Sequence, residues 1–298
     1  MTDRINKFNN CMAVILVENG ACVFMNKLLV LAKNKETYFI KRLLKEGGER
    51  IIIFNPWSDE VTPAIEKLSR ILVRTTGVYG GEADLLFLKR QPSYKKIMNS
   101  LLALETFRSK KRQYEFFDKF GIPSLPWLDL QISQRDDLEN FIKAHPAYLY
   151  LIKPHRGQAG WGITTFTAEE LLNWFQERFE NQGDLEYLLQ VYHGEAQELR
   201  FFFTGEDWSA TLERIREVQK VAANFGQGGG ARRVVTPESF FQILKIIRRE
   251  IPLYYGAIDA LIIQGSPVIL EVNTCPGIEQ LEAVTGESVI NRILKGLE

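Results

Sequence analysis

Two short apolar segments near the C-terminal end, residues 257–263 and 267–272, are joined by Gln264-Gly265-Ser266. Apolar runs on either side of a short glycine-containing turn predict a β-hairpin with largely buried strands. Polar side chains interrupt this hairpin at three positions, which are Asp259, Glu271 and Asn273. A buried polar group must find a partner that offsets its lost hydration. The hairpin therefore constrains the fold and also marks a candidate binding site.

The three polar residues of the hairpin are predicted to share one face of a sheet. Successive side chains of a strand point to opposite faces, so Glu271 and Asn273 lie on the same side. With Gly265 near the tip of the hairpin, Asp259 falls opposite Glu271. Two carboxylates and an amide oxygen form an oxygen-donor site of the kind that Mg²⁺ prefers, completed by water and phosphate. The alternative is a solvated polar face, which the apolar neighbours in both strands argue against.

A glycine-rich segment follows the apolar run 148–153. Lys153 ends that run, and Gly157, Gly160 and Gly162 come after it. Glycines let a backbone approach a ligand closely, and the N–H groups of such a loop cradle phosphate oxygens while a lysine adds positive charge. The segment has neither the Gly-Lys-Ser/Thr of a Walker loop nor the following helix of a dinucleotide fingerprint. The alternative is an ordinary β-hairpin loop.

A second glycine-rich segment spans residues 224–231, in which Gly228, Gly229 and Gly230 follow Asn224. A run of this kind forms an anion-binding nest or a flap, and the alternative is a surface linker. Three basic residues on predicted elements, Lys110, Arg200 and Arg214, are further candidates for binding phosphate, although most such residues are simply solvated.

Composition excludes several other functions. The 298 residues include 37 Lys and Arg and 37 Asp and Glu, so the net charge is zero and no basic excess favours nucleic acid or a membrane surface. The basic cluster 108–112 is therefore predicted to be a solvated helix face. Three scattered cysteines favour neither disulfides nor zinc, and the N-terminal apolar run is too short for a signal peptide or membrane span. We expect a cytoplasmic protein with no membrane or nucleic-acid partner.

The remaining pattern predicts a mixed α/β and α+β fold. Strands are expected at 12–17, 51–54, 71–74, 148–153, 163–166, 187–192, 199–204 and 208–215. Helices are expected at 62–71, 97–107, 109–120, 136–144, 167–180 and 236–250, with Gly121 as a C-cap and Pro237 in the first helical position. These elements divide into an N-terminal α/β domain (1–104) and two further units (105–190 and 191–298).

These features occur in an order that resembles the ATP-grasp superfamily. The chain is most similar to the ribosomal-protein glutamate ligase branch, and more distantly to glutathione synthetase and D-alanine–D-alanine ligase. The segment 270–286, which reads Glu-Val-Asn, then Pro-Gly, Glu and Thr-Gly, is close to the ending of that branch. The resemblance covers roughly residues 105–290. It implies a preceding N-terminal α/β domain and a two-subdomain ATP-grasp fold that binds ATP between residues 105–190 and 191–298.

The resemblance also implies roles for individual residues. The nucleotide would be bound by Lys110, Lys153, Gly157, Gly160, Gln190, Val191, Tyr192, His193 and Glu198. The lysines would contact phosphates, strand 190–193 would bind adenine through its backbone, and Glu198 would accept from the ribose. Two Mg²⁺ ions, with Mn²⁺ as an alternative, would be held by Asp259, Glu271 and Asn273. The residues implied to stabilise the reacting oxyanion are Arg214, Asn224, Gly228 and Gly229.

By the same resemblance, the chain is expected to be an ATP-dependent carboxylate–amine ligase that works through an acylphosphate. Its substrates would be a small-molecule or peptide carboxylate and an amine, with glutamate addition to a protein tail as one option. A homo-oligomer is compatible with the resemblance. Two alternatives stay open, a kinase on the same scaffold that phosphorylates a hydroxyl, and a non-catalytic nucleotide-binding protein.

Overall fold

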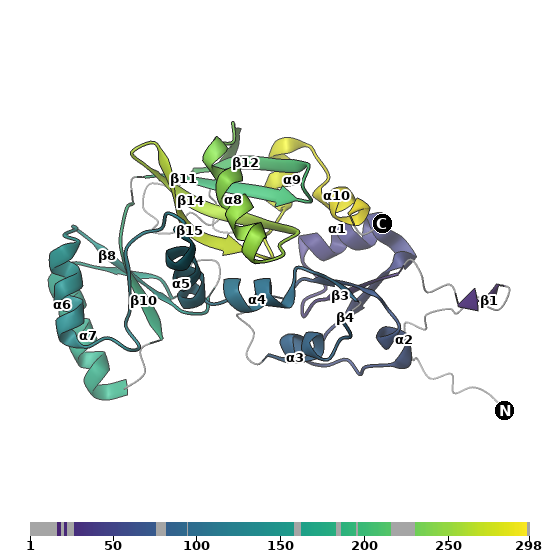
Figure 1. Cartoon of the computed structure of the whole chain (residues 1–298), viewed down its shortest axis with the longest axis horizontal. Coiled ribbons are helices and arrows are strands. Elements are labelled where there is room, and N and C mark those ends of the chain that lie inside the picture. The colour runs from purple at the N-terminus through teal and green to yellow at the C-terminus, as the bar shows by residue number, and fades with distance from the viewer. Residues whose placement is uncertain are drawn as a thin grey trace, which may run out of the picture.

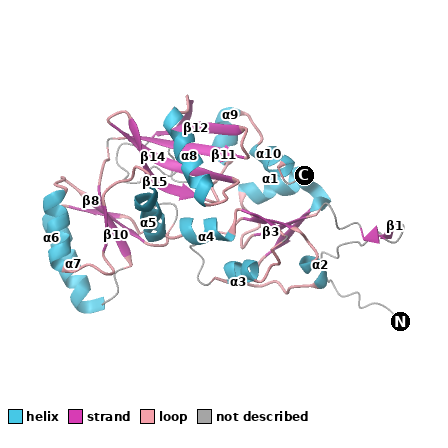
Figure 2. Ribbon diagram, viewed as in Figure 1, coloured by secondary structure: helices cyan, strands magenta, loops and turns pink. Residues whose placement is uncertain are grey.

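A computed structural model of the chain describes residues 17–18, 21–22, 27–75, 82–93, 95–157, 162–182, 186–194, 196–215 and 230–296. Three sheets of four or five strands follow one another along the long axis of the molecule, beside a small ribbon of β1 (Val17–Glu18) and β2 (Ala21–Cys22) (Figure 1). Helices flank each of the three sheets (Figure 2). Across the described ranges, none of the helices combines the length and the apolar character that a membrane span requires.

The N-terminal sheet is parallel, with the strand order β4-β3-β5-β6. Its strands are β3 (Leu28–Leu31), β4 (Ile51–Phe54), β5 (Arg70–Val73) and β6 (Lys96–Met98). Its helices are α1 (Tyr38–Gly47), α2 (Pro63–Glu66), α3 (Ala83–Lys89) and α4 (Leu101–Phe107), with a 3₁₀ turn at Gly48–Arg50. Parallel sheets bury both faces, and here α1 covers one face while α2 and α3 lie on the other (Figure 1).

The C-terminal sheet is antiparallel, with the strand order β13-β12-β11-β14-β15. Its strands are β11 (Gln197–Thr204), β12 (Trp208–Ile215), β13 (Gly230–Val234), β14 (Tyr255–Ile263) and β15 (Ser266–Asn273). The accompanying helices are α8 (Glu238–Glu250), α9 (Glu279–Thr285) and α10 (Val289–Lys295). Residues Phe201 and Phe203 pack under α8 on one face of this sheet. We call the opposite face, which carries Phe202, Tyr255 and Ala257, the site face.

Between these two sheets in sequence lies a third unit with its own core. Its antiparallel sheet has the order β7-β10-β8-β9. The strands are β7 (Trp127–Asp129), β8 (Tyr150–Pro154), β9 (Thr164–Phe166) and β10 (Tyr187–Val191). Helices α6 (Arg135–Ala144) and α7 (Ala168–Gln182) lie together on one side of it (Figure 1). The buried residues of this unit form a separate hydrophobic cluster around Phe141, Tyr150 and Phe175.

Helix α5 (Lys110–Phe120) joins the third unit to the C-terminal sheet. Ser109 caps its first turn by accepting from the Arg112 N–H, and Gly121 ends it in the left-handed conformation at φ 63°, which glycine adopts without strain. The Gln113 side chain accepts from the backbone N–H of Val272 on β15 at 2.8 Å. The chain after the helix stays on the same strand, because the Ile269 N–H donates to the Pro123 carbonyl at 2.7 Å.

The N-terminal and C-terminal sheets share one hydrophobic core. Phe39 and Ile40 of α1 belong to the same buried cluster as Tyr255 and Ala257 of the site face and Ile290 of α10. Burial of apolar surface stabilises by about 25 cal/mol per Å², so a shared core makes the two sheets depend on each other for stability.

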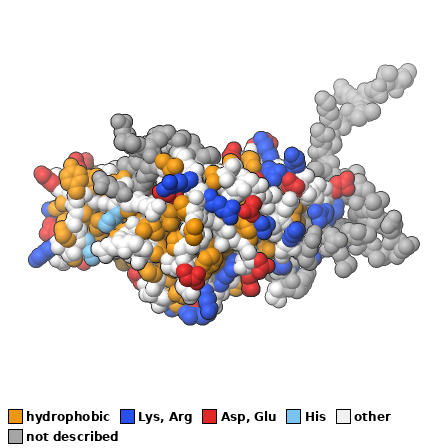
Figure 3. All heavy atoms as spheres, turned by 90° about the horizontal axis from the view of Figure 1, so that it is seen from above, with side chains coloured by type: hydrophobic (Ala, Val, Ile, Leu, Met, Phe, Trp, Pro, Cys, Tyr) orange, Lys and Arg blue, Asp and Glu red, His pale blue; other side chains and the backbone are white. Residues whose placement is uncertain are grey.

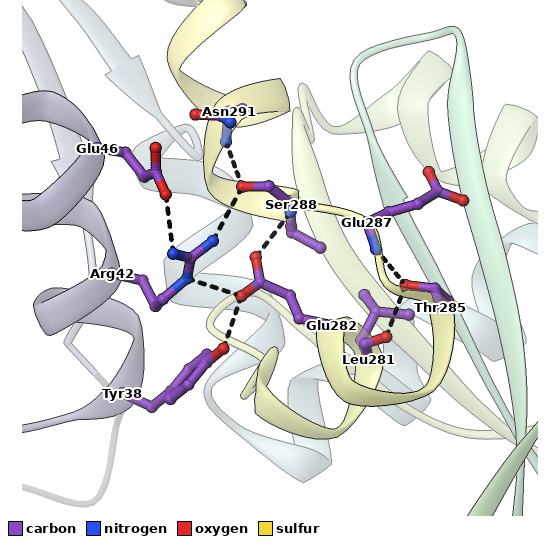
Figure 4. Close-up of polar contacts among 10 residues, drawn as sticks. Tyr38, Arg42, Glu46, Leu281, Glu282, Thr285, Glu287, Ser288 and Asn291 are labelled. Carbon is purple, nitrogen blue, oxygen red and sulfur yellow. Dashed lines mark hydrogen bonds and ion pairs between the residues drawn. The ribbon is translucent and has the colours of Figure 1, made fainter.

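Polar contacts reinforce this junction around Glu282 (Figure 4). One oxygen of its carboxylate accepts from the Tyr38 hydroxyl at 2.8 Å and from Arg42 Nε at 3.0 Å. The other oxygen accepts from the Val289 backbone N–H at 2.8 Å. Arg42 also donates to the Ser288 hydroxyl at 3.3 Å. Glu282 thereby ties α1 of the N-terminal domain to α9 and α10.

Most of the predicted elements are present, and two helices were predicted wrongly. The helix expected at 62–71 is only α2, and β5 begins at Arg70 because Ile71 and Leu72 pair with β3. The helix expected at 97–107 is preceded by β6, which pairs with β5. In both places, strand pairing in a buried sheet outweighs the local helical spacing. Pro237 precedes α8 as its N-cap rather than opening it. Except for Val17, the strand expected at 12–17 lies outside the described residues.

The Glu282 contacts predict a measurable stability difference between two glutamates. Glu282→Gln removes the charge that Arg42 and Tyr38 bind, and the free energy of unfolding should fall by about 1–3 kcal/mol because the side chain is 7% exposed. Glu36→Gln is the matched control, since Glu36 pairs with Lys41 at the surface and is 79% exposed; about 0.5 kcal/mol or less should be lost. Urea unfolding measures both values. Equal losses would contradict the role of Glu282.

Candidate active site

The C-terminal hairpin has the predicted register. Asp259 on β14 lies directly opposite Glu271 on β15, and Asn273 lies opposite Ala257. The turn uses Gln264 at φ 53° and Gly265 at φ 80°. Two successive residues in the left-handed region are typical of the tight turn that matches the twist of a hairpin. Asp259, Glu271 and Asn273 therefore share the site face, and Asp259 is 2% exposed.

A row of charged residues continues from this hairpin across the neighbouring strands. Arg200 on β11 is the cross-strand partner of Asp259, and its guanidinium donates from Nε to Oδ1 at 2.5 Å and from Nη2 to Oδ2 at 2.5 Å. On the next position of the same face, Arg214 of β12 donates to Glu198 of β11 at 2.5 Å. The Arg200–Asp259 pair is bidentate, and bidentate arginine–carboxylate pairs are strong and have a fixed geometry. The site face thus carries two adjacent arginine–carboxylate pairs.

The two carboxylates of the hairpin differ in their electrostatic environment. Burial acts to raise the pKa of Asp259, but the charge and hydrogen bonds of Arg200 outweigh it and hold this pKa below its usual range. Burial raises the pKa of Glu271, and the nearby Asp259 charge raises it further, against the attraction of Lys110. Asp259 therefore favours its ionised form, whereas Glu271 would need a bound cation to favour ionisation.

The donor set fits a hard cation such as Mg²⁺. A carboxylate has about four lone-pair sites, so Asp259 keeps acceptor capacity beside its two bonds from Arg200. The Asn273 Oδ1 atom accepts from the Cys275 N–H at 2.9 Å, which orients the amide. Among the described residues no group of three or more His, Cys, Asp or Glu side chains has metal-binding geometry. A cation here would depend on few protein ligands plus phosphate and water, which is the arrangement typical of Mg²⁺.

Two buried lysines face this hairpin from other elements. Lys153 at the end of β8 is 6% exposed, and Lys110 in the first turn of α5 is 9% exposed. Lys110 Nζ donates to the Gly157 carbonyl of the glycine-rich loop at 3.0 Å. The expectation that residues 108–112 form a solvated helix face is wrong, because Lys110 is buried and Arg108 forms a 2.7 Å ion pair with the buried Asp84.

The Glu271 carboxylate acts electrostatically on both lysines, although burial is the larger effect on each. Burial lowers the pKa of Lys153 to about 8, and Glu271 opposes that shift. Burial likewise lowers the pKa of Lys110, with Glu271 again opposing and Lys153 adding to the effect. Two ammonium groups and two carboxylates from α5, β8, β14 and β15 therefore converge on one site.

Tyr114 lies within the helix predicted at 109–120 and was not among the predicted site residues, but the structure gives it a polar role in this site. Its buried hydroxyl lies 3.1 Å from Lys153 Nζ, 3.2 Å from Gln190 Oε1 and 2.8 Å from the Leu270 carbonyl. The Lys153 ammonium also lies 4.7 Å from the centre of the ring. Tyr114 thus links β8, β10 and β15. Its position in α5 gave no signal of this, because a tyrosine at helical spacing is usually core.

The structure places the other predicted residues as follows. Gln190 and Val191 are the last two residues of β10. Strand β7 pairs with β10 as far as Gln190, and Val191 pairs with Tyr150 of β8. Gln190 is 1% exposed, and its Nε2 atom has no hydrogen-bond partner within the part of the chain that the structure describes. Tyr192 and His193 follow in the connection to β11, and the His193 carbonyl accepts from the Ala196 N–H. Predicted residues outside the described ranges are Gly160, Asn224, Gly228 and Gly229.

Comparison with known proteins gives consistent results. The family model of the RimK-like ATP-grasp domain matches residues 109–297. A probable alpha-L-glutamate ligase of Ectopseudomonas mendocina (strain ymp) is 26% identical over 296 residues, which cover 91% of this chain and 95% of that protein.

Solved structures share the fold at lower identity. D-cycloserine synthetase DcsG has a TM-score of 0.71 and 15% identity, covering 91% of this chain and 98% of that one. A RiPP-associated ATP-grasp ligase of Chryseobacterium gregarium, in complex with ADP and a leader and core peptide, has a TM-score of 0.67 and 17% identity, covering 92% and 96%. These matches confirm the predicted fold class.

The pKa of Lys153 predicts how nucleotide binding depends on pH. A phosphate attracts the ammonium form, so the affinity for MgADP should be steady below about pH 8 and fall above it, by up to about tenfold per pH unit. Binding at pH 9 should then take up a proton, which calorimetry in buffers of different ionisation enthalpy detects. Lys153→Arg keeps the charge at all these pH values and should lose most of the proton uptake. Wild-type uptake in that variant would exclude Lys153 as the source.

Proposed function

The chain belongs to the RimK-like ATP-grasp family, and from this premise we propose that it is an ATP- and Mg²⁺-dependent carboxylate–amine ligase. The observation that carries the proposal is the convergence of Lys110 and Lys153 on the carboxylate of Glu271, which lies directly opposite Asp259 on the hairpin. Buried like charges are costly unless opposite charges meet them, and phosphates with a bound cation would complement both sets.

Each group of residues would have a distinct task. Lys110, which donates to the Gly157 carbonyl, and Lys153, which lies in β8 just before the glycine-rich loop, would bind phosphate oxygens together with Gly157 and Gly160. Asp259, Glu271 and Asn273 would hold Mg²⁺, which supplies charge neutralisation for phosphoryl transfer when bound. The backbone of residues 190–193 would bind adenine where β10 extends beyond β7. Glu198, fixed by Arg214, would accept from the ribose.

The proposed reaction forms an amide in two steps. A substrate carboxylate takes the terminal phosphoryl group of ATP to give an acylphosphate and ADP. An amine then attacks the acyl carbon, and phosphate leaves from the tetrahedral oxyanion. Arg214, which lies on the site face, would stabilise that oxyanion. The resemblance assigns the same role to Asn224, Gly228 and Gly229, which lie outside the described residues. No covalent intermediate with the enzyme is needed.

The substrates are proposed from the relatives. Their names point to L-glutamate as the amine, and the peptide-bound structure points to a peptide carboxylate as the acid. In the view of Figure 3, basic and acidic side chains are interspersed over the surface. We therefore propose that the protein recognises individual carboxylates rather than a large charged polymer. We also propose that it is a cytoplasmic enzyme.

The proposal is tested by ADP release with Mg²⁺-ATP and pooled peptides and amino acids, with and without hydroxylamine. Release that depends on a carboxylate and yields a hydroxamate would support the acylphosphate, because hydroxylamine captures acylphosphates and not phosphate esters. A phosphate ester without hydroxamate would identify a kinase instead. Nucleotide binding without any turnover would favour a non-catalytic protein.

Loss of the metal-binding side chains should abolish turnover without unfolding the protein. Glu271→Gln and Asn273→Ala should each lower ADP release at least about 100-fold, because a cation contributes several kcal/mol to phosphoryl transfer. The control is Glu279→Gln, the same substitution at an exposed position in the first turn of α9, which should leave release unchanged. Retained turnover in both site variants, with normal thermal unfolding, would exclude the metal assignment.

A further inference from the structure

Arg74 is a partly buried arginine whose charge has no carboxylate partner among the described residues. It follows β5, at the carboxyl end of the N-terminal parallel sheet. Its Nη1 donates to the Tyr255 hydroxyl at 3.3 Å, and its Nη2 donates to the Pro276 carbonyl at 3.2 Å. The guanidinium lies 3.7 Å from the centre of the Phe39 ring. All three partners are neutral, so they orient the positive charge without neutralising it.

The other arginines around the site are paired with acids. Arg200 pairs with Asp259, Arg214 with Glu198, and Arg108 with Asp84. In these three pairs each acid is at most 7% exposed, so a buried carboxylate balances the charge of each of the three arginines. Arg74 departs from that pattern, and its remaining side-chain N–H groups have no partner among the described residues that would keep them from an anion.

Arg74 contacts the apolar part of the site face at Tyr255, and it also contacts the loop that follows the candidate metal ligand Asn273. Tyr255, Ala257 and Asp259 alternate onto that face along β14, so the Tyr255 backbone is about 13 Å from that of Asp259. Pro276, which Arg74 contacts, is three residues after the proposed metal ligand Asn273 and so lies at most about 11 Å from it along the chain. Open ends of parallel strands are also where α/β folds bind ligands.

We infer that Arg74 binds a carboxylate of a substrate at the junction between β5 and the loop 273–276. This inference rests on the proposed ligase function and names a class of substrate for that ligase. The substrate is either an acid with a second carboxylate besides the one that is activated, or an amine that carries a carboxylate. Arginine suits this task because its planar fork binds both oxygens of a carboxylate. The stacking on Phe39 holds the fork in place before the ligand arrives, which lowers the entropic cost of binding.

The test is calorimetric binding of two probes to the protein with MgADP. L-glutamate carries a free amine and two carboxylates, whereas N-acetyl-L-glutamate has no free amine and reports only on the acid. Arg74→Gln should weaken one or both probes about 10- to 100-fold. A loss confined to L-glutamate assigns the carboxylate to the amine substrate, and a loss confined to N-acetyl-L-glutamate assigns it to the acid. Arg74→Lys should lose less, because the charge remains.

Arg248 provides the matched control. Among the described residues its guanidinium also bonds only to neutral groups, the carbonyls of Leu253, Gly205 and Tyr254. It lies on α8 at the opposite face of the sheet. Arg248→Gln should leave both probe affinities unchanged. Thermal unfolding of each variant, and MgADP affinity equal to that of the wild type, would show that the fold and nucleotide site are intact.

Three outcomes would overturn the inference. They are unchanged probe binding in Arg74→Gln, equal weakening in Arg248→Gln, and a wild-type protein that binds MgADP but neither probe. Failure of the wild type to bind MgADP would instead contradict the proposed function, and the inference would fall with it. The nucleotide measurement therefore separates the two failures.

Discussion

The division of the site face is the constraint on which the structure depends. Along β11, β12 and β14 of the C-terminal sheet, the side chains of this face change from apolar to charged. Phe202, Tyr255 and Ala257 lie in the core shared with α1. Arg200 and Asp259 lie two residues from Phe202 and Ala257, at the next position of the same face. One face thus holds the N-terminal domain at one end and the candidate active site at the other. The opposite face is covered by α8, so the sheet cannot shift without exposing apolar surface on both sides.

Charge on this face is arranged so that a ligand completes it. Asp259 is held as an anion by Arg200, while the raised pKa of Glu271 and the lowered pKa values of Lys110 and Lys153 all reflect burial. In each of these last three groups the charged form is less stable than in water. Polyphosphate and a divalent cation would favour the charged form of every one, so binding energy and correct ionisation come together.

The parts of the site that lie close in sequence could be predicted, and the parts assembled by long-range pairing could not. Alternation and a glycine turn were enough to place Asp259 opposite Glu271, because a hairpin is local. Gly121 likewise predicted the C-terminal end of α5. The pairing of Arg200 with Asp259 joins residues 59 positions apart and depends on β11 lying beside β14. Tyr114 gave no signal because its hydroxyl finds partners only after three separate elements have packed around it.

The hydrogen bonds of Tyr114 connect the residues proposed to bind phosphate with the strand proposed to hold the metal. A tyrosine hydroxyl donates one hydrogen bond, and lysine can only donate, so Lys153 must donate to it. The Tyr114 hydrogen is then best used on the Leu270 carbonyl at 2.8 Å, next to Glu271. Turning the Gln190 amide by 180° would let Nε2 donate to the same hydroxyl and satisfy an otherwise unpaired buried group. In that arrangement, the lysine proposed to bind phosphate is connected through one hydroxyl to β15, which bears the proposed metal ligands Glu271 and Asn273.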